Sequence, residues 1–108
     1  MNYRYATSVT FTYCFDLDGT LCTNTEGSYE EALPFSERIE SVNKLFNEGN
    51  KIIIFTARGS ETGIDWYEAT KRQLEFWGLK YNKLILGKPF AHKYIDDRGM
   101  SDKDFFKD

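Results

Sequence analysis

Histidine and cysteine are scarce in this chain of 108 residues, which contains one histidine and two cysteines. Two cysteines in an intracellular protein are expected to stay reduced, so no disulfide framework is predicted. Cys14 lies within a predicted strand and is expected to be a small core residue, whereas Cys22 lies near the candidate site and could be oxidised. A lone histidine before a strand is more often a surface or capping group, and we expect this of His92 rather than a catalytic role.

Long apolar runs and a strong net charge are also missing. No segment is apolar enough to cross a bilayer, and the first five residues are polar and aromatic, unlike a signal peptide. The expected location is therefore the cytoplasm. The net charge of −3 provides no basic stripe for a nucleic acid backbone, which favours a small molecule as the partner. With this length and 17% aromatic residues, the chain can form one core, so residues 1–108 are predicted to be a single domain.

Two aspartates at the end of a predicted strand are the clearest chemical signal. Residues 9–15 are rich in β-branched and aromatic side chains, as in a buried strand, and Gly19 allows a sharp turn soon afterwards. Asp16 and Asp18 would then lie at the carboxyl end of the strand, where open α/β sheets bind their ligands. A turn between them would let one carboxylate attack a substrate while the other reaches the leaving group. The alternative is that both are ordinary turn or cap residues.

Three further apolar segments, residues 52–55, 84–86 and 94–95, are also predicted strands and are followed by polar side chains. In chain order these side chains are Thr56 and Arg58, then Lys88, then the adjacent pair Asp96 and Asp97. Four strand ends would thus supply acids, a hydroxyl and cations. Arg58 could hold a substrate phosphate or carboxylate in a bidentate contact, or could instead form a salt bridge with a neighbouring acid.

The order of these motifs resembles the haloacid dehalogenase-like superfamily of phosphotransfer enzymes, and the resemblance covers nearly the whole chain. It implies that Asp16 is the nucleophile, Asp18 the general acid/base, and Thr56 and Lys88 ligands of the substrate phosphate. It also implies a magnesium ion, Mg2+, with Asp96 and Asp97 as its acids, and the same site would add Asp16 and a backbone carbonyl near Asp18 as ligands. The segments around Thr56, Lys88 and Asp96 look like those of small bacterial phosphatases of capsule and sugar-phosphate pathways.

Elementary chemistry agrees with these assignments. A carboxylate can approach a negatively charged phosphoryl group only when cations and N–H groups offset the repulsion, which Lys88 and a magnesium ion would do. Magnesium prefers oxygen ligands and keeps several waters, so two or three carboxylates suffice. The family contrast implies that an acid at Asp18 argues against a dehalogenase and favours hydrolysis of an aspartyl-phosphate.

The remaining segments predict an α/β fold. A helix is expected after Pro34, with Ile39 and Val42 on its apolar face and Gly49 at its end, and a second helix between Asp65 and Gly78. A short helix over residues 101–106 would pack a phenylalanine against the sheet. Strand–helix alternation favours a parallel sheet in a three-layer, Rossmann-like arrangement with helices on both faces.

The chain has no room for the cap domain that larger relatives insert, so a capless and open site is expected. A large substrate or a neighbouring copy in a homo-oligomer would cover it, and the loops 22–29 and 58–63 are candidates for substrate selection. The expected function is a magnesium-dependent phosphomonoester hydrolase acting on a sugar phosphate or related metabolite. The alternatives are a phosphate-binding or phosphoryl-accepting regulatory module with the same fold, and a phosphatase acting on a nucleotide or polynucleotide end. A receiver domain uses similar residues, but it opens with the adjacent acid pair that comes last here.

Overall fold

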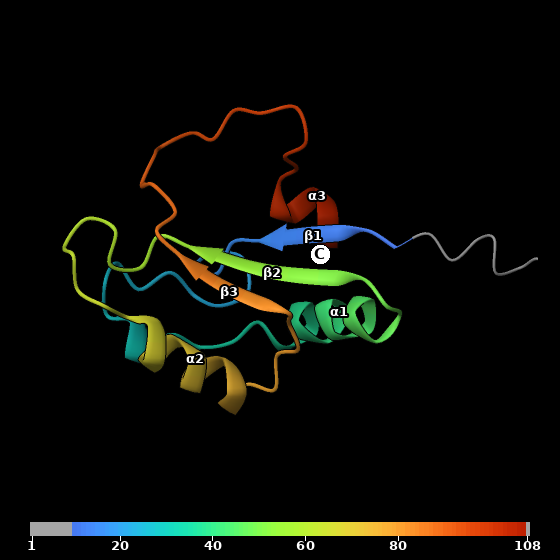
Figure 1. Ribbon diagram of the computed structural model, residues 1–108, viewed down its shortest axis with the longest axis horizontal. Helices are drawn as coiled ribbons and strands as arrows, with labels where there is room; N and C mark the ends of the chain where they lie inside the picture. Colours follow the sequence, from blue (N-terminus) through green and yellow to red (C-terminus); the bar gives the residue numbers. More distant parts are fainter. Residues whose placement is uncertain (1–9, 108) are drawn as a thin grey trace, which may run out of the picture.

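The computed structural model describes residues 10–107 and has a parallel sheet at its centre (Figure 1). The elements in chain order are β1 (Thr12–Phe15), the 3-10 turn η2 (Tyr29–Glu31), α1 (Ser36–Asn47), β2 (Lys51–Thr56), α2 (Tyr67–Phe76), β3 (Lys83–Leu86) and α3 (Asp102–Phe106). The sheet has the order β1-β2-β3, and both pairs are parallel. The carboxyl ends of the three strands therefore meet at one edge, which is where the candidate residues were expected.

The helices form where the sequence predicts them. In α1, Ile39 and Val42 are buried and lie three residues apart, as one face of a helix requires, and the chain turns at Gly49 with φ +97°. In α2, Leu74 is fully buried and Gly78 takes φ +74° after the last turn. Ser101 caps the start of α3, since its Oγ accepts a hydrogen bond from the Asp104 N–H.

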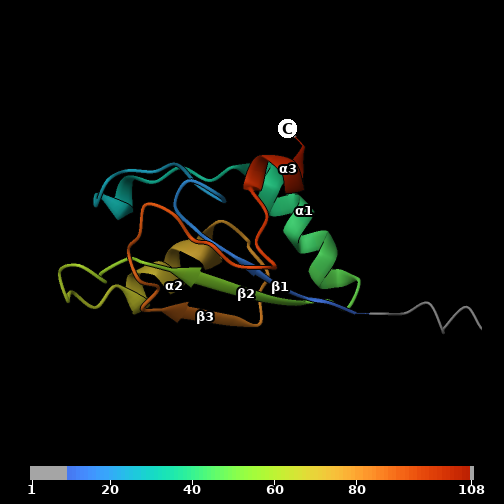
Figure 2. The ribbon, with the colours of Figure 1, turned by 90° about the horizontal axis from the view of Figure 1, so that it is seen from above.

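The sheet is covered on one face, which corrects the expectation of helices on both faces. Phe15, Ile54 and Leu84 lie in register across the three strands, and all are buried in one core with residues of α1 and α2. Phe105 of α3 packs its ring against Phe15 from the same side. Figure 2 shows α1 and α3 together on that side of the sheet. Within residues 10–107 the arrangement therefore has two layers rather than three.

The opposite face of the sheet is open to solvent. Successive strand residues point to opposite faces, so Cys14, between Tyr13 and Phe15, lies on the open face and is exposed. The expectation that Cys14 is a core residue is wrong for this reason. The first strand is also shorter than predicted, and Val9 lies outside the described residues.

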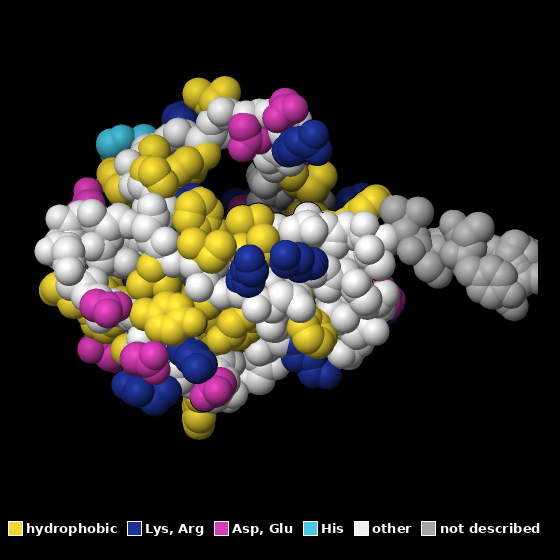
Figure 3. Space-filling view, viewed as in Figure 1, with side chains coloured by type: hydrophobic (Ala, Val, Ile, Leu, Met, Phe, Trp, Pro, Cys, Tyr) yellow, Lys and Arg dark blue, Asp and Glu magenta, His cyan; other side chains and the backbone are white. Residues whose placement is uncertain are grey.

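The expected fourth strand at Tyr94 and Ile95 is absent from the described part of the chain. Residues 87–101 instead form an extended, irregular connection from β3 to α3, and Ile95 is 92% exposed. In Figure 1 this connection arches away from the sheet, and Figure 3 shows an opening beneath it. One edge of β1 therefore pairs with β2, and no described strand pairs with its other edge.

Candidate active site

Asp16 and Lys88 lie close together at the carboxyl edge of the sheet. Asp16 follows β1 directly, and Lys88 follows β3 after Gly87. The Lys88 Nζ is 3.5 Å from the Asp16 Oδ1, and the two side chains are 17% and 39% exposed, respectively. Burial raises the pKa of the Asp16 carboxyl above its ordinary value, and the charge of Lys88 opposes this shift. A carboxylate that is partly desolvated, yet reachable from solvent, is suited to attack an electrophile.

Two neighbours fix the position of Lys88. Its backbone N–H donates a hydrogen bond to the Thr56 carbonyl, so the residue is tied to the end of β2. Its Nζ also lies 4.3 Å from the centre of the Tyr94 ring, and the Tyr94 hydroxyl donates to the Pro89 carbonyl. Sequence reasoning placed Tyr94 in a strand and missed this contact. The ammonium group is thus held beside Asp16 by both its backbone and its side chain.

Thr56 lies at the end of β2, as predicted, and is 1% exposed. Its Oγ1 accepts a hydrogen bond from the Arg58 N–H at 3.2 Å, which holds the turn that follows β2. The hydroxyl keeps its own proton for donation, so it can still serve a phosphate oxygen that reaches it.

Asp18 is held by Arg58 rather than left free. The Arg58 Nε donates to the Asp18 Oδ2 at 2.9 Å, and the Arg58 Nη2 donates to the Asp18 Oδ1 at 2.8 Å. The Arg58 side chain is 1% exposed and that of Asp18 is 16% exposed. The turn beneath Asp18 is closed by three backbone hydrogen bonds: Gly19 N–H donates to the Cys22 carbonyl, and the N–H groups of Thr20 and Leu21 both donate to the Leu17 carbonyl. This bidentate pair is the salt bridge that the sequence left as the alternative for Arg58.

The Arg58 guanidinium is therefore not accessible to a substrate. This finding corrects the expectation that Arg58 contacts a substrate phosphate. Its remaining guanidinium donors are also engaged, with Thr70 Oγ1 at 3.1 Å, Gln73 Oε1 at 2.8 Å and Cys22 Sγ at 3.9 Å. The guanidinium carbon lies 4.7 Å from the centre of the Tyr29 ring. No local pattern in the sequence marks Thr70, Gln73 or Tyr29 as partners of Arg58, because they come from α2 and η2.

Cys22 is fully buried beside this ion pair, a position that disfavours its oxidation. Its Sγ lies 3.5 Å from the Asp18 Oδ1. Burial raises the pKa of the Cys22 thiol to about 12, which disfavours the thiolate that oxidation requires. His92, on the 87–101 connection, is exposed and its ring packs against that of Phe90.

The structure does not bring Asp96 and Asp97 to the other acids. Both are exposed on the 87–101 connection, and the Asp96 Oδ1 accepts the N–H groups of Arg98 and Gly99 in a local turn. Between residues 10 and 107, no three side chains of histidine, cysteine, aspartate or glutamate come together as a metal site. Because Asp96 and Asp97 do not join Asp16 and Asp18, the residues as arranged here do not fit a magnesium ion.

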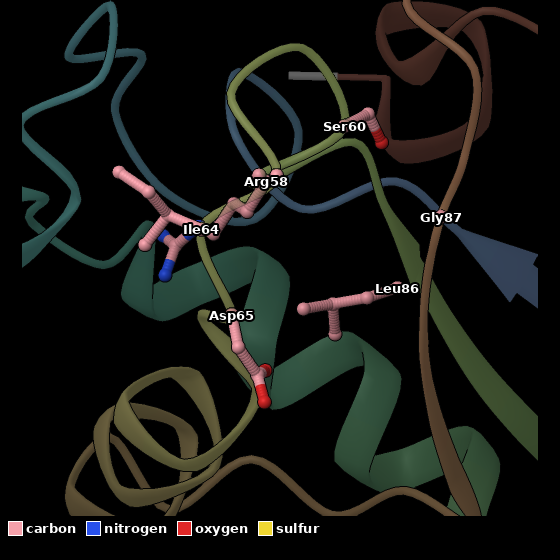
Figure 4. Close-up of a pocket in the computed structure, with 8 residues that line it drawn as sticks. Arg58, Ser60, Ile64, Asp65, Leu86 and Gly87 are labelled. Atoms are coloured by element: carbon pink, nitrogen blue, oxygen red, sulfur yellow. The ribbon is translucent and has the colours of Figure 1, made fainter.

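A shallow depression of about 190 Å3 lies between the loop after β2 and the end of β3 (Figure 4). Leu86 points into it from β3, and Ser60, Ile64 and Asp65 line it from the loop after β2. The Arg58 side chain runs away from it, toward Asp18. The depression includes most of the 58–63 loop that was expected to select the substrate, and Gly87 links it to Lys88.

Comparisons with known proteins support the fold. No protein-family model matches the chain, and no curated protein matches it. The crystal structure of a protein target from Vibrio cholerae matches with a TM-score of 0.81 and 28% identity, over 90% of this chain and 88% of that one. A chain in the structure of a Pnkp1/Rnl/Hen1 complex matches with a TM-score of 0.57 and 21% identity, over 79% of this chain but only 30% of that one. What the second structure shares with this chain is the fold alone. None of the helices in the described residues could cross a membrane.

Proposed function

We propose that this protein is a phosphomonoester hydrolase that works through a phosphoryl group carried on Asp16. The observation that carries the proposal is the pair formed by the Asp16 carboxylate and the Lys88 ammonium, 3.5 Å apart at the carboxyl edge of a parallel sheet. An ammonium beside the nucleophile lowers the repulsion that a phosphate dianion would otherwise meet. Thr56 lies on the strand between them and can donate its hydroxyl to a phosphate oxygen.

The proposed reaction has two steps. In the first, an Asp16 oxygen attacks phosphorus, the bond from phosphorus to the ester oxygen breaks, and Asp18 gives a proton to the leaving alcohol. In the second, Asp18 removes a proton from a water, and that water displaces Asp16 to release inorganic phosphate. The Asp18 Oδ1 faces both the Arg58 Nη2 and the Cys22 Sγ, but the Oδ2 accepts only from the Arg58 Nε and keeps a lone pair for a proton.

We include dependence on magnesium in the proposal, because the order of the acidic motifs resembles that of magnesium-dependent phosphotransfer enzymes. When bound, magnesium would offset phosphate charge. Since the described arrangement does not assemble its ligands, we assign the ion no step. Calorimetric titration with magnesium tests this part directly: binding that is lost in Asp96→Asn supports the acid set, and no heat of binding rejects it.

The expected substrate is a sugar phosphate or related small metabolite. The net charge of −3 disfavours a polyanionic chain, and the depression that ends at Gly87 is lined by both polar and apolar residues, among them Ser60, Asp65 and Leu86. A leaving group with hydroxyls on an otherwise apolar ring would match this lining.

A panel of phosphorylated metabolites, assayed for released phosphate with magnesium present, tests the proposal. Lys88→Ala should lower kcat by about 100-fold or more on every substrate, because each contains the same phosphoryl group. Lys93→Ala is the matched control: it removes an exposed lysine from the same connection and should keep full activity. No release of phosphate from any substrate contradicts the proposal and favours a phosphate-binding module. Equal activity of the two variants contradicts the role of Lys88.

A further inference from the structure

We propose that Arg58 is a positioning residue for Asp18, holding that carboxylate in the orientation in which it exchanges protons with substrate and water. The inference rests on the proposed hydrolase function. In this inference Arg58 does not bind the substrate itself but acts on the reaction through Asp18.

The contacts of the guanidinium define a rigid support. Two of its N–H groups hold both oxygens of Asp18, while those of Nη1 are held by Thr70 and Gln73 on α2. The ring of Tyr29 covers one of its faces. The planar fork of an arginine transfers such a constraint to its partner, because two parallel hydrogen bonds fix both the place and the plane of a carboxylate. Asp18 is thereby tied to α2, although it lies in the turn that follows β1.

The ties to Arg58 also include the segment that follows the nucleophile. The Gln73 Nε2 donates to the Tyr29 carbonyl at 2.9 Å, and the Tyr29 ring contacts Trp66 edge to face. Arg58 is therefore the junction of the Asp18 turn, the end of β2, the helix α2 and the turn η2. Displacing a reacting group by about 1 Å can cost about 100-fold in rate, so a support of this kind has a kinetic effect when it is loosened.

An arginine on the surface of α2 gives the control. Arg38 is buried, but it is unsuitable, because its Nη1 donates to the Thr20 carbonyl in the turn after Asp18 as well as to the Asp102 Oδ2 of α3. Arg72 is exposed on α2, and no described contact joins it to Asp18. Arg72→Lys is therefore the control for Arg58→Lys: both variants keep a positive charge on or beside α2 and lose a guanidinium.

A double-mutant cycle between Arg58 and Asp18 tests the proposal. Arg58→Lys should lower kcat by about 10- to 100-fold without raising KM, because lysine cannot hold both carboxylate oxygens in one plane. In the Asp18→Asn background the same substitution should have no further effect on kcat, since the residue it positions is already inactive. Arg72→Lys should leave kcat within about twofold of wild type.

The possible outcomes separate this inference from the function on which it rests. If wild type releases no phosphate from any substrate, both are overturned. If wild type is active and Arg58→Lys lowers kcat by the same factor with and without Asp18→Asn, Arg58 acts independently of Asp18 and the inference alone is wrong.

Should Arg58→Lys fail to fold, Thr70→Val loosens the same guanidinium with little change in shape, and it too should lower kcat in wild type but not in Asp18→Asn. A crystal structure of either variant should show the Asp18 carboxylate turned from its present plane, and an unmoved carboxylate contradicts the inference.

Discussion

Removing the charge of Arg58 should destabilise the fold strongly, because it would leave the Asp18 carboxylate unpaired. The side chain of Asp18 is 16% exposed and that of Arg58 is 1% exposed, so water can solvate little of the charge that remains. Breaking a buried pair by removing one partner typically costs about 3–5 kcal/mol. Unfolding entropy is about 2.1 cal/mol/K per residue, or about 0.23 kcal/mol/K for this chain of 108 residues. Arg58→Met should therefore lower the melting temperature by about 13–22 °C.

Thermal unfolding followed by circular dichroism at pH 7 measures this change, with urea unfolding as a check on two-state behaviour. The double variant Arg58→Met, Asp18→Asn should recover at least half of the loss, because the buried group left behind is then neutral. Arg98→Met is the control, since Arg98 is 91% exposed and lies 4.0 Å from an exposed Asp97; its melting temperature should not change measurably. A drop of less than about 4 °C for Arg58→Met would refute the reasoning, because it corresponds to a loss of less than about 1 kcal/mol of stability.

Three further predictions concern stability elsewhere. Burial raises the pKa of Asp16 in the folded protein above its ordinary value of 3.8, so the wild type loses stability as the pH rises from 3.8 through the folded pKa. The variant Asp16→Asn should therefore have a higher melting temperature than wild type at pH 7, and this difference should disappear below pH 3.8. The hydrogen bond from Arg38 lowers the pKa of Asp102, so the stability that Asp102 contributes is present above pH 3.8 and is lost as the pH falls through the folded pKa. Asp102→Asn should cost about 1–2 kcal/mol of unfolding free energy in urea at pH 7, and nothing at a pH below the folded pKa. Gly59→Ala should cost more than Gly27→Ala in the same assay, because both have positive φ but only at Gly59 would the new Cβ lie 2.2 Å from a backbone oxygen, that of Ile64.

The helices could be predicted from sequence because their signals are local. Ile39 and Val42 mark the buried face of α1 within one turn, and Gly49 and Gly78 supply the positive φ that ends α1 and α2. β2 was equally clear, since three consecutive isoleucines end in a polar turn.

Pairing across the sheet could not be predicted in the same way, because it joins residues that are distant in sequence. Tyr94 and Ile95 are only two apolar residues, and their assignment to a strand depended on the acids that follow them. The covered face of β1 depends on where Phe105 packs, some 90 residues away, so the exposure of Cys14 had no local sign. The partner of Arg58 was likewise undetermined, since several acids could have met an arginine at that position.

The central claim is that a phosphoryl group is transferred to Asp16, and chemical trapping of the intermediate tests it most directly. Enzyme quenched during turnover and reduced with borohydride should contain homoserine at position 16, as found by peptide mass spectrometry, since reduction converts an aspartyl-phosphate to that residue. The modification should be missing from Asp16→Asn and should accumulate in Asp18→Asn, in which water is no longer activated. Phosphate release with position 16 unmodified in every sample, or with phosphate carried on another side chain, would contradict the account.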